Sequence, residues 1–205
     1  MRLRNDPCAM TKLKESQFLI DSFPFQLQES DVIELGAGKG EMICELAKNN
    51  PAIRYIAIEK YPTVASKIAK KANEYNLKNL FIICKDIEKI NEFLIGKVSL
   101  IWITFSDPWP KKRHFKRRLT YKDFLDKYKN LLAKDGIIKF KTDNDSLFTF
   151  SLESLNEFGA NILFKTSNLH SSQKNIDNIM TGYEQKWSSK GKNINYVEFN
   201  FNKSR

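Results

Sequence analysis

A chain of 205 residues with 41% hydrophobic and 12% aromatic residues suits a folded domain and not a disordered segment. Its 34 basic and 24 acidic residues give a net charge of +10, which favours a polyanionic partner, nucleic acid ahead of an anionic membrane surface. No apolar run approaches the roughly 18 residues of a membrane span, and the N-terminal residues lack the apolar core of a signal peptide, so we expect a cytoplasmic protein with no membrane partner.

The predicted elements alternate between extended and helical segments. In chain order, apolar or alternating runs predict strands at residues 31–35, 54–59, 80–85, 98–105, 137–141, 162–166 and 196–201. Helical spacing of apolar residues predicts helices at residues 41–49, 62–75, 121–132 and 144–158. Several strands are continuous apolar runs, which is typical of a parallel sheet covered on both faces.

The chain shows no linker, so we predict one α/β domain over residues 1–205. Residues 1–30 form an N-terminal extension, and the polar segment 167–192 is expected to be mostly loop. Asp135 and Gly136 are expected to form a turn before the strand at 137–141.

The cysteines and histidines are too dispersed for a metal site. Cys8, Cys44 and Cys84 form no Cys-x-x-Cys pair, and neither His114 nor His170 has a second ligand at metal spacing. We therefore expect no zinc site, no redox dithiol and no metal cofactor.

A glycine-rich loop follows the first predicted strand and contains Gly36, Gly38 and Gly40, two residues after Glu34. The dinucleotide fingerprint Gly-x-Gly-x-x-Gly would need glycine at position 41, where the chain has Glu41. The spacing found here is instead typical of class I methyltransferases, whose loop wraps the amino-acid end and the ribose of S-adenosylmethionine (SAM). This spacing disfavours an NAD-linked dehydrogenase and favours SAM as the ligand.

Two further acids end predicted strands at the same edge of the sheet. Glu59 ends the second strand, where a carboxylate can accept hydrogen bonds from both ribose hydroxyls. Asp86 ends the third strand, where it can meet the adenine amino group. Either acid alone is more often a solvated strand end, but the order of acid, glycine loop, acid and acid favours a SAM site.

The most apolar strand ends in the sequence Ser106-Asp107-Pro108-Trp109-Pro110. Two prolines stiffen this turn and fix the directions of Asp107 and Trp109. A carboxylate and a large aromatic ring suit an extruded base, because the ring can stack and the carboxylate can meet a polar edge. The alternative interpretation is a structural turn with a buried tryptophan.

A basic run follows directly, and six of its eight residues from Lys111 to Arg118 are lysine or arginine. Basic residues interrupted by His114 and Phe115 are typical of RNA backbone binding with stacking. A charge run is usually only a solvated surface, but its position beside the presumed catalytic strand end favours RNA.

These motifs together resemble the bacterial tRNA (guanine-N7)-methyltransferases of the TrmB family. The resemblance extends from about Asp31 to Phe199 and rests on four segments, of which the second is highly specific: Glu34–Gly40, Phe105–Leu119, Phe140–Asn144 and Thr181–Glu184. It implies a class I SAM-dependent methyltransferase fold, Rossmann-like, with a seven-stranded, mostly parallel sheet and helices on both faces. It also implies methylation of the variable-loop guanosine at tRNA position 46, with 7-methylguanosine and S-adenosylhomocysteine as products.

The resemblance also implies roles for individual residues. The SAM site would comprise the glycine loop and four acids: Glu34, Gly36, Gly38, Gly40, Glu59, Asp86 and Asp107. Asp107 is also the expected catalytic residue. Contacts with the target nucleotide are expected from Lys111, Asp143, Thr181, Gly182, Tyr183 and Glu184. Contacts with RNA are expected from Arg113, His114, Phe115, Lys116, Arg117 and Arg118.

Several alternatives remain open at this point. The chain fits a SAM-dependent methyltransferase acting on another RNA base, or a non-catalytic RNA-binding module of the same fold. Methylation of an amino group is disfavoured, since those enzymes resemble Asn/Asp-Pro-Pro-Tyr/Phe and Trp109 stands here in place of the second proline. The short N-terminal region resembles compact members that can form a homodimer, and the oligomeric state stays open. We also expect the 167–192 segment to be mobile until substrate binds.

Overall fold

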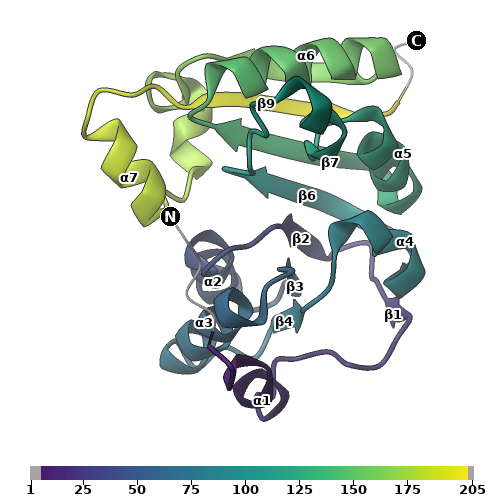
Figure 1. Cartoon of the computed structure of the whole chain (residues 1–205), viewed down its shortest axis with the longest axis vertical. Helices are drawn as coiled ribbons and strands as arrows, with labels where there is room; N and C mark the ends of the chain where they lie inside the picture. The colour runs from purple at the N-terminus through teal and green to yellow at the C-terminus, as the bar shows by residue number, and fades with distance from the viewer. Residues whose placement is uncertain (1–5, 203–205) are drawn as a thin grey trace.

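The computed structural model describes residues 6–202, and its centre is a seven-stranded sheet (Figure 1). Residues 1–5 and 203–205, which belong to the predicted domain, lie outside the described residues. The strands are β2 (Val32–Leu35), β3 (Tyr55–Ile58), β4 (Leu80–Ile83), β6 (Val98–Thr104), β7 (Leu132–Thr142), β8 (Asn161–Thr166) and β9 (Asn195–Asn200). Their order is β4-β3-β2-β6-β7-β9-β8, and only β9 runs antiparallel to its neighbours. The predicted mostly parallel sheet is confirmed.

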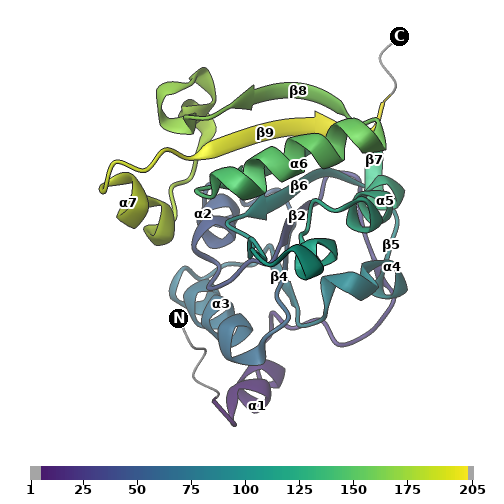
Figure 2. The same cartoon turned by 45° about the horizontal axis from the view of Figure 1, so that its top comes forward.

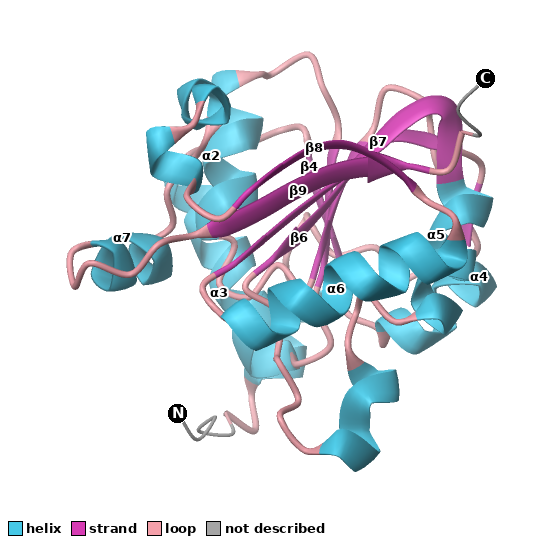
Figure 3. Cartoon of the chain, turned by 90° about the horizontal axis from the view of Figure 1, so that it is seen from above, coloured by secondary structure: helices cyan, strands magenta, loops and turns pink. Residues whose placement is uncertain are grey.

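Helices cover both faces of this sheet, as the continuous apolar strands predict. The longer helices are α1 (Ala9–Lys14), α2 (Glu41–Asn49), α3 (Pro62–Glu74), α5 (Lys122–Leu131), α6 (Asp145–Phe158) and α7 (Gly182–Ser188). One core joins α5, α6 and the short α4 (Ile90–Phe93) to the sheet, and the other joins α1, α2 and α3 to its opposite face. Figure 3 shows α6 and α2 on opposite sides of the strands.

A small second sheet pairs β1 (Phe25–Gln26) with β5 (Leu94–Ile95) in parallel. The sequence analysis did not predict it, because two-residue strands carry too few residues for an alternating pattern. None of the helices formed by residues 6–202 combines the length and the apolar composition that crossing a bilayer requires.

The prediction of a turn at Asp135 and Gly136 is wrong, because β7 begins at Leu132 and continues through both residues. Gly136 packs against the neighbouring strand so closely that a Cβ atom there would lie 2.9 Å from the Val98 carbonyl oxygen. The pairing of β6 with β7 shifts register between Val98 and Leu100. The glycine therefore permits a close approach at a bulge and does not end the strand.

The expectation that residues 167–192 are mostly loop is wrong in part. The segment contains α7 and two short 3-10 helices, Leu169–Ser171 and Gln173–Asp177. Thr181 caps α7, since its hydroxyl oxygen accepts a hydrogen bond from the Glu184 backbone N–H at 3.0 Å. The polar sequence of this segment does not predict α7, because so short a helix depends on tertiary contacts and not on an amphipathic pattern.

The strand order reverses between β2 and β6, and open parallel sheets bind ligands at such a point. The glycine loop follows β2, and the Asp107 turn follows β6, so both lie at this switch point. Helix α7 lies beyond the same ends of β6 and β7 (Figure 1). Figure 2 shows that the chain reaches α7 from the edge of the sheet formed by β8 and returns from it into β9. The fold thus brings three distant sequence motifs to one edge.

Candidate active site

The glycine loop leaves open space beside its backbone. Gly36 and Gly38 have φ angles of 70° and 57°, and a Cβ atom at either position would meet nothing within 4 Å. Gly40 differs, because a Cβ atom there would lie 2.8 Å from the Ile68 side chain, where α2 packs on α3. Gly36 and Gly38 therefore leave room for a ligand, and Gly40 lets two helices approach.

Glu34 places a buried carboxylate against a cavity of about 420 Å³. Its Oε1 atom accepts a hydrogen bond from the Thr104 hydroxyl at 2.6 Å, and its buried Oε2 atom has no partner among the described residues. Burial raises the pKa of Glu34 to about 7. An unpartnered buried acceptor lining a cavity is suited to a cationic ligand group, such as an ammonium.

Glu59 and Asp86 line a second cavity of about 650 Å³. Glu59 accepts hydrogen bonds from the backbone N–H groups of Gly38 and Tyr61 at 3.1 and 3.0 Å, which ties it to the glycine loop. Burial raises its pKa. Asp86 already has two partners, since it pairs with Lys60 at 2.5 Å and accepts the Glu88 N–H at 3.0 Å. A ligand contact from Asp86 would have to share its carboxylate with Lys60.

Asp107 lies where the two cavities meet, because both are lined by Gly36 and by residues 105–107. Phe105 and Trp109, on either side of it, have φ angles of 47° and 43°, a region that non-glycine residues seldom adopt. Arg118 holds the turn from behind by donating to the carbonyl oxygens of Pro108 at 2.9 Å and Trp109 at 3.2 Å. The strained turn is thus braced, and the exposed Asp107 carboxylate is not engaged by any of residues 6–202, which leaves it available to a ligand.

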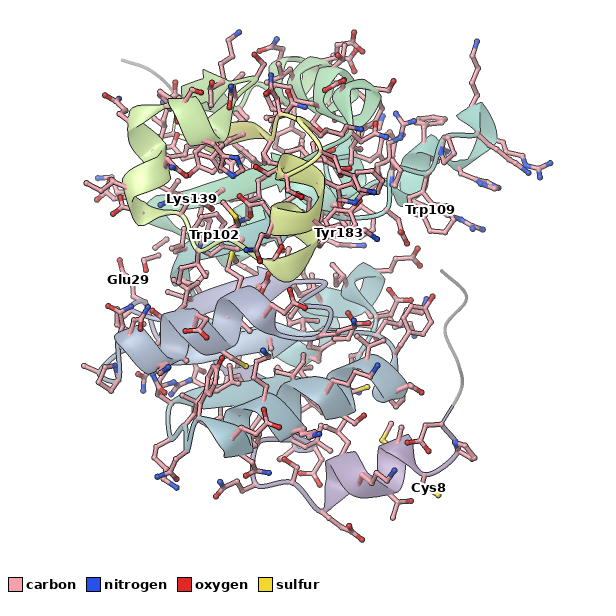
Figure 4. The ribbon with its side chains drawn as sticks, turned by 90° about the vertical axis from the view of Figure 1, so that its left-hand side faces the viewer. Cys8, Glu29, Trp102, Trp109, Lys139 and Tyr183 are labelled. Carbon is pink, nitrogen blue, oxygen red and sulfur yellow. The ribbon has the colours of Figure 1, made fainter. Side chains whose placement is uncertain are left out.

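The two aromatic rings near Asp107 face different cavities. Trp109 lines the cavity of Glu59, with the Arg117 guanidinium 4.9 Å from its ring and the His114 ring at its edge. Tyr183 lines the cavity of Glu34, 5.1 Å from the Phe105 ring. Figure 4 shows Trp109 on the chain after β6 and Tyr183 on α7. The rings beside the Glu34 cavity are therefore those of Phe105 and Tyr183, and stacking of a base on Trp109 stays a prediction.

Helix α7 is anchored by a buried ion pair that the sequence analysis missed. Lys141 of β7 lies 2.7 Å from Glu184, and neither side chain has any exposed surface. His170 and Asn178 each lie 2.8 Å from the other Glu184 oxygen. Although burial opposes it, Lys141 lowers the pKa of Glu184. The Glu184 carboxylate is therefore already engaged by the protein, and its contact with a target nucleotide stays a prediction.

Three of the other predicted substrate residues, Asp143, Thr181 and Tyr183, line the Glu34 cavity. The Tyr183 hydroxyl donates to Asp143 at 3.2 Å. Lys111 is exposed at the start of the basic run. Asp143, Thr181 and Tyr183 thus come together from separate parts of the chain, and contact of Lys111 with the target nucleotide stays a prediction.

The basic run forms a 3-10 helix over Lys112–Arg117, and most of its side chains are exposed. His114 and Arg118 are half-buried, and Arg118 packs against the Phe150 ring at 4.3 Å and braces the Asp107 turn. The predicted RNA-contacting residues are thus a set of exposed cations, Arg113, Lys116 and Arg117, together with His114, Phe115 and the structural Arg118.

Comparison with known proteins identifies the family to which these features belong. A family model described as "Putative methyltransferase" matches residues 28–197. The tRNA (guanine-N(7)-)-methyltransferase of Mycoplasma mobile is 53% identical, over 98% of this chain and 100% of the relative. That of Mycoplasmopsis synoviae is 57% identical, over 96% of each chain. This chain belongs to the tRNA (guanine-N7)-methyltransferase family. The resemblance inferred from the four sequence motifs is confirmed.

Solved structures support the fold of the family. A 16S rRNA methyltransferase, KamB, superimposes with a TM-score of 0.63 at 12% identity, over 97% of this chain and 94% of that one. Precorrin-6y C5,15-methyltransferase from Geobacter metallireducens superimposes with a TM-score of 0.56 at 15% identity, over 96% and 86%. The predicted class I methyltransferase fold is therefore confirmed.

Membership of this family implies SAM as the methyl donor, and the residues present fit it. Glu34 Oε2 is a buried acceptor without a partner among residues 6–202, suited to the amino group of the donor. Gly36 and Gly38 leave open space where a ligand can approach the backbone. Glu59 stands at the end of β3 with its carboxylate beside the same loop.

The raised pKa of Glu34 predicts a pH-dependent affinity for SAM. Below about pH 7 the carboxyl is protonated, so binding of a cationic amino group requires loss of that proton. We expect the affinity to rise as pH increases from 5 to 7, approaching tenfold per pH unit at the acidic end, because above that range the amino group of SAM begins to lose its own proton. Calorimetric titrations of SAM across this range measure it. Glu34→Gln is the control and should bind weakly with a flat profile, whereas an unchanged slope in that variant would assign the effect to another group.

Proposed function

We propose that this protein transfers the methyl group of SAM to N7 of the guanosine at position 46 in the tRNA variable loop. The products are 7-methylguanosine and S-adenosylhomocysteine. The observation that carries the proposal is the position of Asp107, an exposed carboxylate at the junction of two cavities, one lined by Glu34 and the other by Glu59. Family membership supports the same reaction.

Glu34, Glu59 and the open glycines would hold the methyl donor, with Asp86 contributing beside Lys60. Bound SAM supplies an electrophilic methyl group on a sulfonium. Guanine N7 carries a lone pair and no proton, so the protein need not provide a general base. Its main task is alignment, which can contribute about 7–11 kcal/mol to lowering the barrier.

The negative charge of Asp107 is complementary to the positive charge of the methylated guanine. Methylation at N7 makes the guanine ring cationic, and a carboxylate held in a braced turn can stabilise this charge as it develops. The same group can accept hydrogen bonds from the N1 and N2 edge of the base. Both roles place the guanine between Asp107 and Tyr183, with Asp143 of the same cavity as a further contact. Lys111, exposed a few residues after Asp107, is proposed as an additional contact.

The basic run would bind the tRNA backbone. Arg113, Lys116 and Arg117 are exposed, and Arg117 and Trp109 line the cavity next to Asp107. Phosphates of the strand that enters the site would therefore meet cations within a few residues of the catalytic turn.

The position of methylation is tested with two tRNA transcripts that differ only at position 46. We expect methyl incorporation with guanosine there and a loss of at least about a hundredfold with adenosine there, since adenine keeps N7 but lacks the N1–H and 2-amino donors that Asp107 would hold. Equal incorporation into both transcripts would contradict the proposed position of methylation, but it would not contradict SAM as the methyl donor.

A further inference from the structure

Glu41 is the residue that separates the glycine loop from a dinucleotide fingerprint, and the structure gives it a specific contact. It is the first residue of α2, directly after Gly40. Its Oε2 atom accepts a hydrogen bond at 2.6 Å from the backbone N–H of Gly182, which lies 141 residues further along the chain. Glu41 also lines the Glu34 cavity, together with Thr181 and Tyr183. It thus joins the glycine loop to the 167–192 segment.

The contact completes a set of attachments that hold α7 above the cavity. Glu184 is fixed to β7 through Lys141, at 2.7 Å. Tyr183 reaches Asp143 at 3.2 Å, also just after β7. Glu41 is the member of this set that comes from the loop expected to hold the methyl donor. It therefore spans the two halves of the site.

We propose that Glu41 is a positioning residue that couples the cofactor loop to the 167–192 segment and so places Tyr183 over the target guanine. This inference rests on the proposed function, because it gives Glu41 a role in placing Tyr183 over the target guanine of that function. When the glycine loop is fixed by a bound ligand, the Glu41 carboxylate is fixed with it, and the N-terminus of α7 gains a rigid acceptor. Glu41 then acts through Gly182 and Tyr183, not on the reacting atoms.

A purely electrostatic role predicts the opposite result. Glu41 is a negative charge at the edge of a site that binds a polyanion, so its removal alone should strengthen tRNA binding. A positioning role predicts that removal weakens productive binding of tRNA. The sign of the effect therefore separates the two explanations.

The test uses the whole chain in four single variants and one double variant. Glu41→Ala removes the acceptor, and Glu41→Gln keeps an oxygen at the same place. Gly182→Pro removes the donor N–H, and proline suits the first position of a helix, where Gly182 stands after an extended Thr181. Glu157→Ala removes the same charge from an exposed position on α6 and is the matched control.

Three readouts are measured on each variant. Tryptic cleavage at Lys186, Lys190 and Lys192, followed by mass spectrometry with and without SAM, reports attachment of α7 independently of activity. Steady-state kinetics with tRNA, and calorimetry with SAM alone, separate tRNA use from cofactor affinity.

We expect Glu41→Ala and Gly182→Pro to increase cleavage and to lower kcat/KM for tRNA about tenfold, with SAM affinity changed less than about threefold. SAM should protect the segment in wild type but not in these variants, and their combination should be no worse than either alone. Glu41→Gln and Glu157→Ala should stay near wild type. Unchanged cleavage in Glu41→Ala, or a higher kcat/KM for tRNA, would overturn the proposal. If wild type forms no 7-methylguanosine but cleavage still depends on Glu41, the proposed function fails and the coupling stands.

Discussion

Replacing Asp107 with alanine is expected to slow methyl transfer to tRNA by about 10²–10³-fold while leaving the protein folded. The residue is exposed, and within the part of the chain that the structure describes the turn is braced by Arg118, which donates to the carbonyl oxygens of Pro108 and Trp109. The loss should therefore come from the missing negative charge beside a base that becomes cationic. Single-turnover rates at saturating SAM and tRNA measure this directly, with thermal unfolding as the check on folding.

Asp107→Asn distinguishes the two roles proposed for the carboxylate. An amide of the same shape can still accept a hydrogen bond from the base, but it carries no charge. A rate close to that of Asp107→Ala would assign the effect to charge, and a rate near wild type would assign it to hydrogen bonding. Wild-type rates in both variants would remove Asp107 from the mechanism.

Replacing Lys141 with methionine is expected to cost about 3–5 kcal/mol of unfolding free energy, because it leaves the Glu184 carboxylate buried without its cation. His170 and Asn178 remain as partners, but neither replaces a fully buried ammonium 2.7 Å away. Urea denaturation at neutral pH measures the loss. The 167–192 segment should also become sensitive to trypsin, since α7 loses its anchor on β7.

The double variant Lys141→Met with Glu184→Leu provides the control. Replacing both charges by apolar side chains removes the unpaired carboxylate, so most of the stability should return. A single Lys141→Met variant as stable as wild type would contradict the assigned role of the pair. Equal stability of the single and double variants would show that Glu184 does not need the cation.

The elements that position the site could largely be predicted from the sequence, because each carries a local signal. The amphipathic pattern after the glycine loop predicts a helix at residues 41–49, and α2 spans Glu41–Asn49. Apolar runs predict three strands that end at residues 35, 59 and 105. The observed strands β2, β3 and β6 end at Leu35, Ile58 and Thr104, each within about two residues of the predicted end. The parallel arrangement then places the glycine loop and the Asp107 turn at one edge of the sheet.

The contacts that organise the site could not be predicted, since they join residues far apart in the chain. Lys141 is one of three lysines in β7, and nothing local shows that it is the buried one, that Glu184 is its partner, or that His170 binds the same carboxylate. Thr104 pairs with Glu34 across neighbouring strands, and Glu41 with Gly182 across the site. Arg118 belongs to the basic run by sequence, yet tertiary packing gives it a structural position. Which of these distant residues contact one another is determined by the tertiary fold and not by their spacing in the sequence.

The most direct test of the proposed function is methyl transfer from labelled SAM to unmodified tRNA, followed by digestion and identification of the labelled nucleoside. We predict a single labelled product, 7-methylguanosine, that is absent with Asp107→Ala on the same time scale. A different methylated nucleoside, or no transfer by the folded protein, would contradict the proposed function.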